Sequence, residues 1–97
     1  MRRRFLFAYD IRDERRLRAV HQIAKAYGEP LQYSVFVGDL DRGERLGLEA
    51  DLRDAMNLTV DSVVFVDLGE ATGRGSDCFE FLGHRPFDLP QSGAVIV

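Results

Sequence analysis

The spacing of hydrophobic and polar residues predicts a strand and then a helix in the first part of the chain. Residues 5–10 alternate aromatic side chains with smaller or polar ones, which is typical of a strand that ends at Asp10. From Asp13 the apolar residues take helical spacing, and Gly28 is a suitable residue to end that helix. The alternating aromatic residues are Phe5, Phe7 and Tyr9, and the helical stripe consists of Leu17, Val20, Ala24 and Tyr27.

The middle of the chain repeats this order. Residues 31–40 alternate again and predict a strand, in which Gly38 marks a kink or a split into two short strands. Asp41 and Glu44 have the spacing of a capping box, which begins a second helix that ends near Asn57. Its apolar face consists of Leu48, Leu52, Ala55 and Met56.

The last third of the chain carries three further apolar runs. Residues 62–68 are nearly all apolar, which predicts a central strand with both faces covered. A glycine-rich loop over residues 69–77 separates this strand from a shorter one predicted over residues 78–82. An irregular stretch over residues 83–93 then leads to a short terminal strand over residues 94–97.

This order of elements predicts the α+β class, as a ferredoxin-like βαββαβ sandwich whose antiparallel sheet has two helices on one face. We expect a single domain over residues 1–97, because a chain of 97 residues leaves no room for a second. The tail, residues 83–97, would add a C-terminal edge strand, either to its own sheet or to the sheet of a dimer partner. A second copy would cover the remaining sheet face most simply, so we expect a homodimer.

Hydropathy and cysteine usage narrow the class of protein. No apolar stretch is long enough to span a bilayer and the N-terminus lacks the pattern of a signal peptide, so we expect a cytoplasmic protein without a membrane role. The single Cys78 cannot form an intramolecular disulfide, and with His21 and His84 it makes no zinc framework. We expect Cys78 to be a thiol of the core.

The charge is unevenly distributed along the chain. The formal net charge of −3 disfavours nucleic-acid binding when it is taken alone. Residues 1–25, however, carry eight basic side chains and only three acidic ones. Nearly all the basic residues are arginine, which binds phosphate bidentately, although a GC-rich coding sequence produces the same bias without a functional cause.

Asp10 is the candidate metal ligand. The sequence has no nucleophile elbow, no convincing Cys/His pair and no glycine-rich phosphate loop. A carboxylate at the end of an apolar strand can instead hold a hard cation while nearby arginines hold a phosphate, as metal-assisted phosphodiester hydrolysis requires. The candidate arginines are Arg12, Arg15, Arg16 and Arg18. One carboxylate is few for Mg²⁺, but a two-fold dimer would bring two copies of Asp10 together.

Other roles for these residues stay open at this point. An aspartate at the end of a strand is also typical of a turn that begins a helix. An arginine-rich first turn is also typical of a solvated helix face.

Two linked motifs resemble the CRISPR-associated Cas-two family. They are Phe7-Ala8-Tyr9-Asp10-Ile11 and Gln32-Tyr33-Ser34-Val35-Phe36-Val37-Gly38-Asp39-Leu40, with Arg16-Leu17 and Tyr27-Gly28 between them. The resemblance covers residues 5–68 well and the closing strands loosely. It implies that Asp10 binds the metal with Tyr9 beside it as a catalytic residue, and that Arg16 is the family's arginine of the first helix. Ser34 and Phe36 match the supporting strand motif of the family.

The resemblance also implies a function. Members of the family act in spacer acquisition as homodimers that bridge dimers of a larger integrase and help to hold protospacer duplex DNA. Several are described as Mg²⁺-dependent endonucleases on single-stranded RNA or double-stranded DNA. The tail, residues 79–97, looks more like the branch that is chiefly an assembly subunit, whereas the Tyr-Asp-Ile motif that this branch often lacks is intact here.

Two alternatives to an endonuclease remain. The first is a purely non-catalytic adaptor, which needs no metal and binds the integrase through its C-terminal strand. The second is an unrelated ferredoxin-like RNA-binding or regulatory domain, in which Phe5, Phe7 and Tyr9 would stack on bases. The apolar character of the whole strand favours a core or dimer position for these rings.

Overall fold

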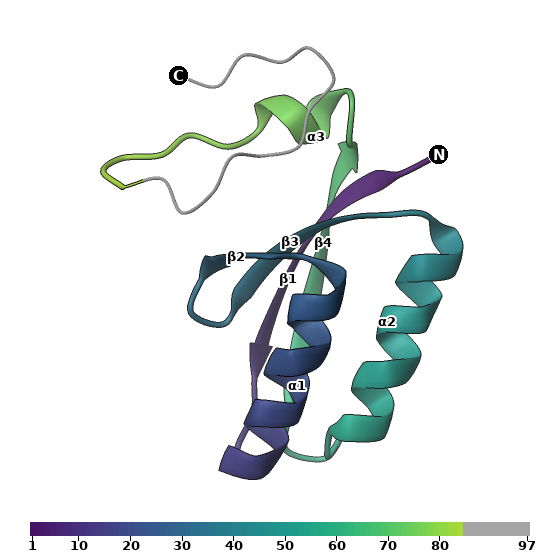
Figure 1. Cartoon of the computed structure of the whole chain (residues 1–97), viewed down its shortest axis with the longest axis vertical. Coiled ribbons are helices and arrows are strands. Elements are labelled where there is room, and N and C mark those ends of the chain that lie inside the picture. The colour runs from purple at the N-terminus through teal and green to yellow at the C-terminus, as the bar shows by residue number, and fades with distance from the viewer. Residues whose placement is uncertain (85–97) are drawn as a thin grey trace.

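The computed structural model of the chain describes residues 1–84, in which strands and helices follow one another in the order βαββαβα (Figure 1). The elements are β1 (Arg3–Asp10), α1 (Glu14–Tyr27), β2 (Glu29–Gln32), β3 (Val35–Leu40), α2 (Arg42–Ala55), β4 (Ser62–Glu70) and the short α3 (Arg74–Asp77). The strands form one antiparallel sheet in the order β2-β3-β1-β4, and α1 and α2 lie together in front of it in Figure 1. This is the arrangement of a ferredoxin-like sandwich, so the predicted fold class is confirmed.

Side-chain caps fix where both long helices begin. The carboxylate of Asp13 accepts the backbone N–H of Arg16 at 3.0 Å and caps α1, which ends at Gly28. In α2 the Asp41 carboxylate accepts the backbone N–H of Glu44, and the Glu44 carboxylate accepts that of Asp41. The predicted capping box is therefore confirmed.

Aromatic rings fill the core between the sheet and the helices. Phe7 is buried, and its ring lies 5.9 Å from that of Phe36 on β3 and 6.1 Å from that of Phe65 on β4. The helices contribute Val20, Ala24, Leu48 and Leu52. The predicted helical stripes thus face the sheet, and the β1 rings lie in the core, as the apolar character of the strand indicated.

The face of the sheet turned away from α1 and α2 is apolar. Within residues 1–84, part of this face is exposed to solvent. We call it the open face; by strand alternation it carries Leu6, Ala8, Val35, Val64 and Val66. Val64 and Val66 are 54% and 43% exposed. The prediction of a central strand over residues 62–68 is wrong, because β4 lies at the edge of this sheet. Its continuous apolar sequence contributes one side to the core and the other to the open face.

The predicted second strand is in fact two strands, and the break lies at Tyr33 and Ser34 rather than at Gly38. Gly38 lies inside β3, where an added Cβ would meet the carbonyl oxygen of Tyr27 at 2.5 Å. An added Cβ at Gly28 would likewise meet a backbone carbonyl oxygen of β3 at 2.6 Å. Both glycines allow α1 and β3 to approach closely. The ladder between β3 and β1 continues through Gly38 without a register shift, so the predicted kink there is wrong.

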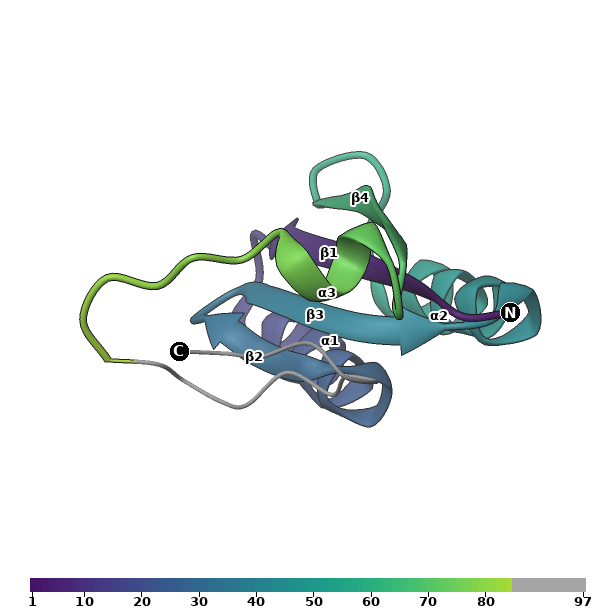
Figure 2. The same cartoon turned by 90° about the horizontal axis from the view of Figure 1, so that it is seen from above.

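Beyond β4 the chain turns into α3, at the top of Figure 1 and nearest the viewer in Figure 2. The buried Arg4 side chain holds this turn. Its guanidinium donates to the two carboxylate oxygens of Asp39 at 2.6 and 2.9 Å and to the carbonyl oxygen of Gly75 at 2.9 Å. By strand alternation Arg4 shares the face of Leu6, so α3 occupies the end of the open face where β1 begins.

The strand predicted over residues 78–82 is wrong. These residues form no ladder with any strand of residues 1–84, and the rings of Phe79 and Phe81 stack on each other instead, with centroids 6.1 Å apart. Cys78 is half-buried beside α3 rather than in the core, and its Sγ lies 3.6 Å from the carbonyl oxygen of Gly75. The predicted terminal strand, residues 94–97, lies outside the described residues. Over residues 1–84, none of the helices has the length and hydropathy to cross a membrane.

Candidate functional site

Asp10 lies where the sequence predicts it, at the end of β1. It pairs with Ser62, the first residue of β4, and strand alternation directs its side chain to the face of Leu6 and Ala8. The side chain is 65% exposed. Asp10 therefore presents an accessible carboxylate at one end of the open face, opposite the end that α3 occupies.

The four candidate arginines differ in their surroundings. The guanidinium of Arg12 lies 3.4 Å from the Asp10 carboxylate, and that of Arg18 lies 3.7 Å from Glu14. Both side chains are about two-thirds exposed. Arg15 is also exposed, and the structure pairs it with no carboxylate of residues 1–84. These three residues leave guanidinium groups accessible beside Asp10 and along the first two turns of α1.

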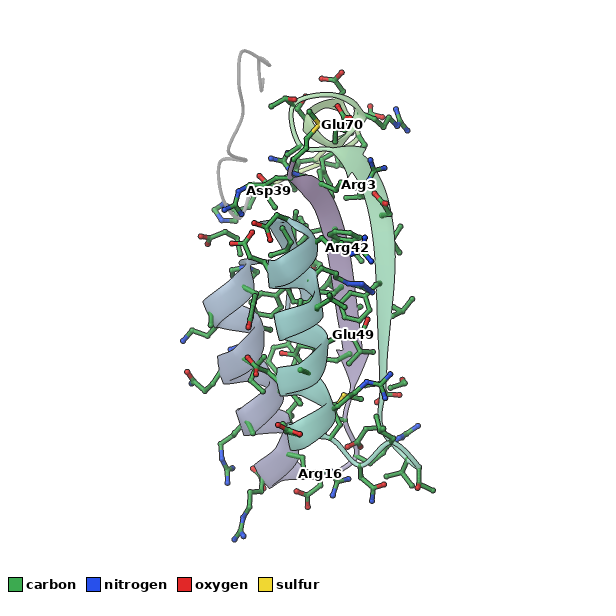
Figure 3. The ribbon with its side chains drawn as sticks, turned by 90° about the vertical axis from the view of Figure 1, so that its right-hand side faces the viewer. Arg3, Arg16, Asp39, Arg42, Glu49 and Glu70 are labelled. Carbon is green, nitrogen blue, oxygen red and sulfur yellow. The ribbon has the colours of Figure 1, made fainter. Side chains whose placement is uncertain are left out.

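Arg16 is held by Asp61, a buried residue that the sequence analysis missed. The Arg16 Nε and Nη2 donate to the two oxygens of Asp61 at 2.8 and 3.2 Å, and the Asp61 side chain is completely buried. The backbone N–H groups of Arg12 and Asn57 also donate to this carboxylate. Arg16 and these two backbone donors hold the pKa of Asp61 far below its usual range, although burial acts in the opposite direction. Figure 3 shows Arg16 at the end of the molecule far from Arg3 and Glu70.

Tyr9 lies next to Asp10 in the sequence but on the other face of the sheet. Its side chain is buried among the core residues, and its hydroxyl is hydrogen-bonded to Nδ1 of His21 at 2.7 Å. Burial raises the pKa of Tyr9, so the hydroxyl stays protonated at neutral pH. Asp10 and Tyr9 therefore do not share one site within a subunit.

The supporting motif residues also belong to the structure around β1. The carbonyl oxygen of Ser34 accepts the backbone N–H of Tyr9 at 3.1 Å. Phe36 is fully buried and stacks on Tyr9 with ring centroids 6.2 Å apart, while the ring of His21 meets its edge. Both residues hold the end of β1 in place and neither reaches the face of Asp10.

The residues present fit Mg²⁺ only as a shared site. Mg²⁺ prefers oxygen ligands, keeps several waters and takes one or two protein carboxylates. The exposed Asp10 carboxylate is such a ligand, whereas no group of three or more acidic, histidine or cysteine side chains gathers anywhere in residues 1–84. A second copy of Asp10 from a partner subunit would supply the other carboxylate.

The fold and this site together define a class: small ferredoxin-like α+β proteins with an exposed aspartate at the end of β1 and arginines beside it. The chain belongs to the CRISPR-associated Cas2 family, because the family model described as CRISPR associated protein Cas2 matches residues 2–74. The resemblance seen in the sequence motifs is thereby confirmed.

Similar proteins agree with this assignment. A relative from Rhodospirillum rubrum named CRISPR-associated endoribonuclease Cas2 1 is 39% identical over 67 residues, which are 69% of this chain and 66% of that protein. Another from Synechocystis, named CRISPR-associated endoribonuclease Cas2 3, is 33% identical over 96% of this chain and 97% of that protein. The crystal structure of Streptococcus pyogenes Cas2 superimposes with a TM-score of 0.70 and 28% identity, covering 82% of this chain and 99% of that one.

Proposed function

We propose that this protein is a homodimeric, Mg²⁺-dependent endonuclease of the CRISPR adaptation machinery. The observation that carries the proposal is the accessible Asp10 carboxylate at the end of an apolar sheet face, with the arginine-rich first turn of α1 beside it. The names of the relatives from Rhodospirillum and Synechocystis, both endoribonucleases, support cleavage of RNA. Duplex DNA is the second substrate to test.

The open face supports the dimer. Its exposed valines on β4 leave apolar surface in water, and an identical face would bury it. The buried ion pair of Arg4 and Asp39 and the overlying α3 occupy one end of this face. A second copy would therefore pack nearer the other end, where Asp10 lies, and two Asp10 side chains would approach each other across the two-fold axis.

In such a dimer, different residues of the chain would bind the metal and the phosphates. Two Asp10 carboxylates would hold the ion, and the exposed arginines Arg12, Arg15 and Arg18 would neutralise the phosphates of the bound strand. When bound, Mg²⁺ supplies a water of lowered pKa and stabilises negative charge on the phosphate. Arg12 lies close enough to the Asp10 carboxylate to pair with it.

A cleavage assay with purified protein tests this function. Wild type, Asp10→Asn and Asp54→Asn are incubated with labelled single-stranded RNA and duplex DNA, in Mg²⁺ or in EDTA. Asp54 is an exposed residue of α2, which packs on the other face of the sheet from Asp10, so Asp54→Asn makes the same chemical change outside the proposed site. We expect cleavage by wild type and Asp54→Asn that requires Mg²⁺, and none by Asp10→Asn. Equal cleavage by Asp10→Asn would contradict the proposal.

A non-catalytic adaptor is the second candidate. It is favoured by the observation that one subunit offers a single exposed carboxylate at this site and no acidic cluster within residues 1–84. In that role the homodimer would bridge dimers of the larger integrase, and its arginines would bind protospacer duplex DNA. Wild type that binds duplex DNA but cleaves neither substrate would support the adaptor.

A further inference from the structure

The buried carboxylate of Asp61 joins three segments of the chain next to the turn that follows Asp10. The Oδ1 atom of Asp61 accepts the backbone N–H of Arg12 at 2.8 Å and the Nη2 of Arg16 at 3.2 Å. Its Oδ2 atom accepts the Nε of Arg16 at 2.8 Å and the backbone N–H of Asn57 at 2.9 Å. The turn between β1 and α1, the first turn of α1 and the connection from α2 to β4 are therefore fastened to one side chain.

Asp61 is placed to hold Asp10 rather than to touch a substrate. Its side chain has no exposed surface, and both oxygens already accept two hydrogen bonds each. No lone pair is left for a metal ion. A buried carboxylate with this many donors is instead a rigid anchor.

The anchor lies on one side of Asp10 and the sheet on the other. Asp10 is paired with Ser62 in the β1 and β4 ladder, and Ser62 directly follows Asp61. The next fixed point along the chain is the backbone N–H of Arg12, which Asp61 binds. The backbone that carries the Asp10 side chain is therefore fixed both before and after it.

We infer that Asp61 is a positioning residue for the metal-binding Asp10, and that Arg16 acts as the partner of Asp61 and not as a ligand of phosphate. This inference rests on the proposed function. Mg²⁺ demands a nearly ideal octahedral geometry, so a small displacement of a carboxylate weakens its binding. Loss of a group that orients a metal ligand typically reduces metal affinity or activity about 10- to 100-fold.

Metal binding measured without substrate tests whether Asp61 positions Asp10. Mn²⁺ is titrated calorimetrically into wild type, Asp61→Asn, Asp10→Asn and the exposed control Asp54→Asn, at a temperature well below the melting temperature of each. The amide group of Asp61→Asn faces an N–H donor with one of its own, so the anchor is broken while the size of the side chain is kept. We expect the dissociation constant to rise about tenfold or more in Asp61→Asn and to stay unchanged in Asp54→Asn.

A second variant keeps the test decisive if Asp61→Asn fails to fold. Arg16→Lys keeps the positive charge and both backbone hydrogen bonds of Asp61 but loses the two-pronged contact. We expect a smaller rise in the Mn²⁺ dissociation constant. If Asp61→Asn folds and binds Mn²⁺ as wild type does, the inference is overturned and the proposed function still stands. If only Arg16→Lys folds, unchanged Mn²⁺ binding in that variant has the same meaning. Mn²⁺ binding that survives in Asp10→Asn overturns the proposed function and the inference with it.

RNA binding in EDTA tests whether Arg16 contacts phosphate. Each phosphate contact to a single strand contributes about 0.7 to the slope of the logarithm of affinity against the logarithm of salt concentration. We expect Arg15→Gln, which removes an exposed guanidinium, to reduce the slope by about that amount. Arg16→Gln should leave the slope unchanged. A slope reduced equally in both variants would show that Arg16 binds phosphate and would overturn its assignment to Asp61.

Discussion

Alternation along β1 separates neighbouring residues into different environments. The Tyr9 side chain is buried against Phe36 and hydrogen-bonded to His21, whereas the Asp10 side chain is exposed on the opposite face. A sequence motif places Tyr9 and Asp10 side by side, but it does not show that they lie on opposite faces. Adjacent side chains of a strand point in opposite directions. We therefore expect Tyr9 to contribute to the proposed site only through the packing of β1.

The variant Tyr9→Phe tests that role. It removes one hydrogen bond to His21 and keeps the ring, so we expect the free energy of unfolding to fall by about 1 kcal/mol. Cleavage of RNA should remain within a few-fold of wild type, as measured by initial rates under conditions where both proteins are folded. Loss of cleavage as complete as in Asp10→Asn would instead make Tyr9 a catalytic residue.

The buried Asp61 predicts a dependence of stability on acid pH. Its pKa is lowered in the folded protein, so the unfolded chain binds more protons as the pH falls below about 4. The stabilisation is therefore fully present above that pH and is lost as the pH falls towards the folded pKa. The exposed pair of Arg3 and Asp67 lowers the pKa of Asp67 in the same direction, but solvent screens it.

Urea unfolding at a series of acid pH values measures this effect. Wild type should lose stability steadily below about pH 4, and Asp61→Asn, already less stable, should lose less over the same range. Asp54→Asn, the exposed control, is measured alongside both proteins. Parallel curves for wild type and Asp61→Asn would mean that the Asp61 carboxylate is not the group that titrates.

Local sequence identified the exposed residues of the site but not the buried ones. Asp10 follows from the end of an alternating run, and Arg12 and Arg15 follow from their closeness to it. Asp61 gives no periodic signal, since it and Ser62 are only a pair of polar residues before an apolar run. Its partner Arg16 lies 45 positions away in the sequence, so only the folded sheet brings the two together.

At the scale of elements, the close approach of α1 to β3 depends on glycine. An added methyl group at Gly38 would lie 2.5 Å from the carbonyl oxygen of Tyr27, and backbone cannot yield there as a flexible side chain would. We expect Gly38→Ala to lower the free energy of unfolding by about 1–3 kcal/mol. Thermal or urea unfolding measures the change.

Gly43→Ala is a matched control for this substitution. Gly43 lies in the first turn of α2, where an added Cβ meets only the Asp41 carboxylate at an ordinary 3.5 Å. Alanine favours a helix more than glycine does, so we expect Gly43→Ala to stabilise the protein by up to about 1 kcal/mol. Stabilisation by Gly38→Ala as well would contradict the tight approach of α1 and β3.

Elements with strong local signals were predicted correctly, and those that depend on distant partners were not. The capped helices α1 and α2 begin where their caps predict. The position of β4 at the edge and the absence of a ladder over residues 78–82 depend on which strands lie alongside, which hydrophobic spacing does not encode. The turn into α3 likewise requires the buried Arg4, which lies 71 positions before Gly75.

At the scale of the whole molecule, the proposed site belongs to two subunits. Wild type and Asp10→Asn can therefore be mixed in equal amounts under conditions that allow subunits to exchange. If both Asp10 carboxylates are needed, only dimers of two wild-type subunits are active, and cleavage should fall to about a quarter of that of the same total amount of wild type. Cleavage at about a half would show that each subunit acts alone.

Two companion mixtures control this experiment. Wild type mixed with Asp54→Asn should retain full cleavage, because that change lies on α2 away from the open face. Val64→Asp, which places a charge on the open face, should shift the protein to monomer in analytical ultracentrifugation and lose cleavage. A Val64→Asp variant that stays dimeric would place the interface elsewhere.

The position of β1 in the sheet also determines when this site can form during protein synthesis. β1 is translated first, yet it lies between β3 and β4, and β4 ends at Glu70. Until β4 has left the ribosome, the Asp10 end of β1 lacks both its ladder partner Ser62 and its anchor Asp61. Pairing between such distant segments is slow, because a long loop must close before the contacts reward it. Among the strands of residues 1–84, β1, which carries the proposed metal ligand, is therefore made before the others and gains its second ladder partner only with β4.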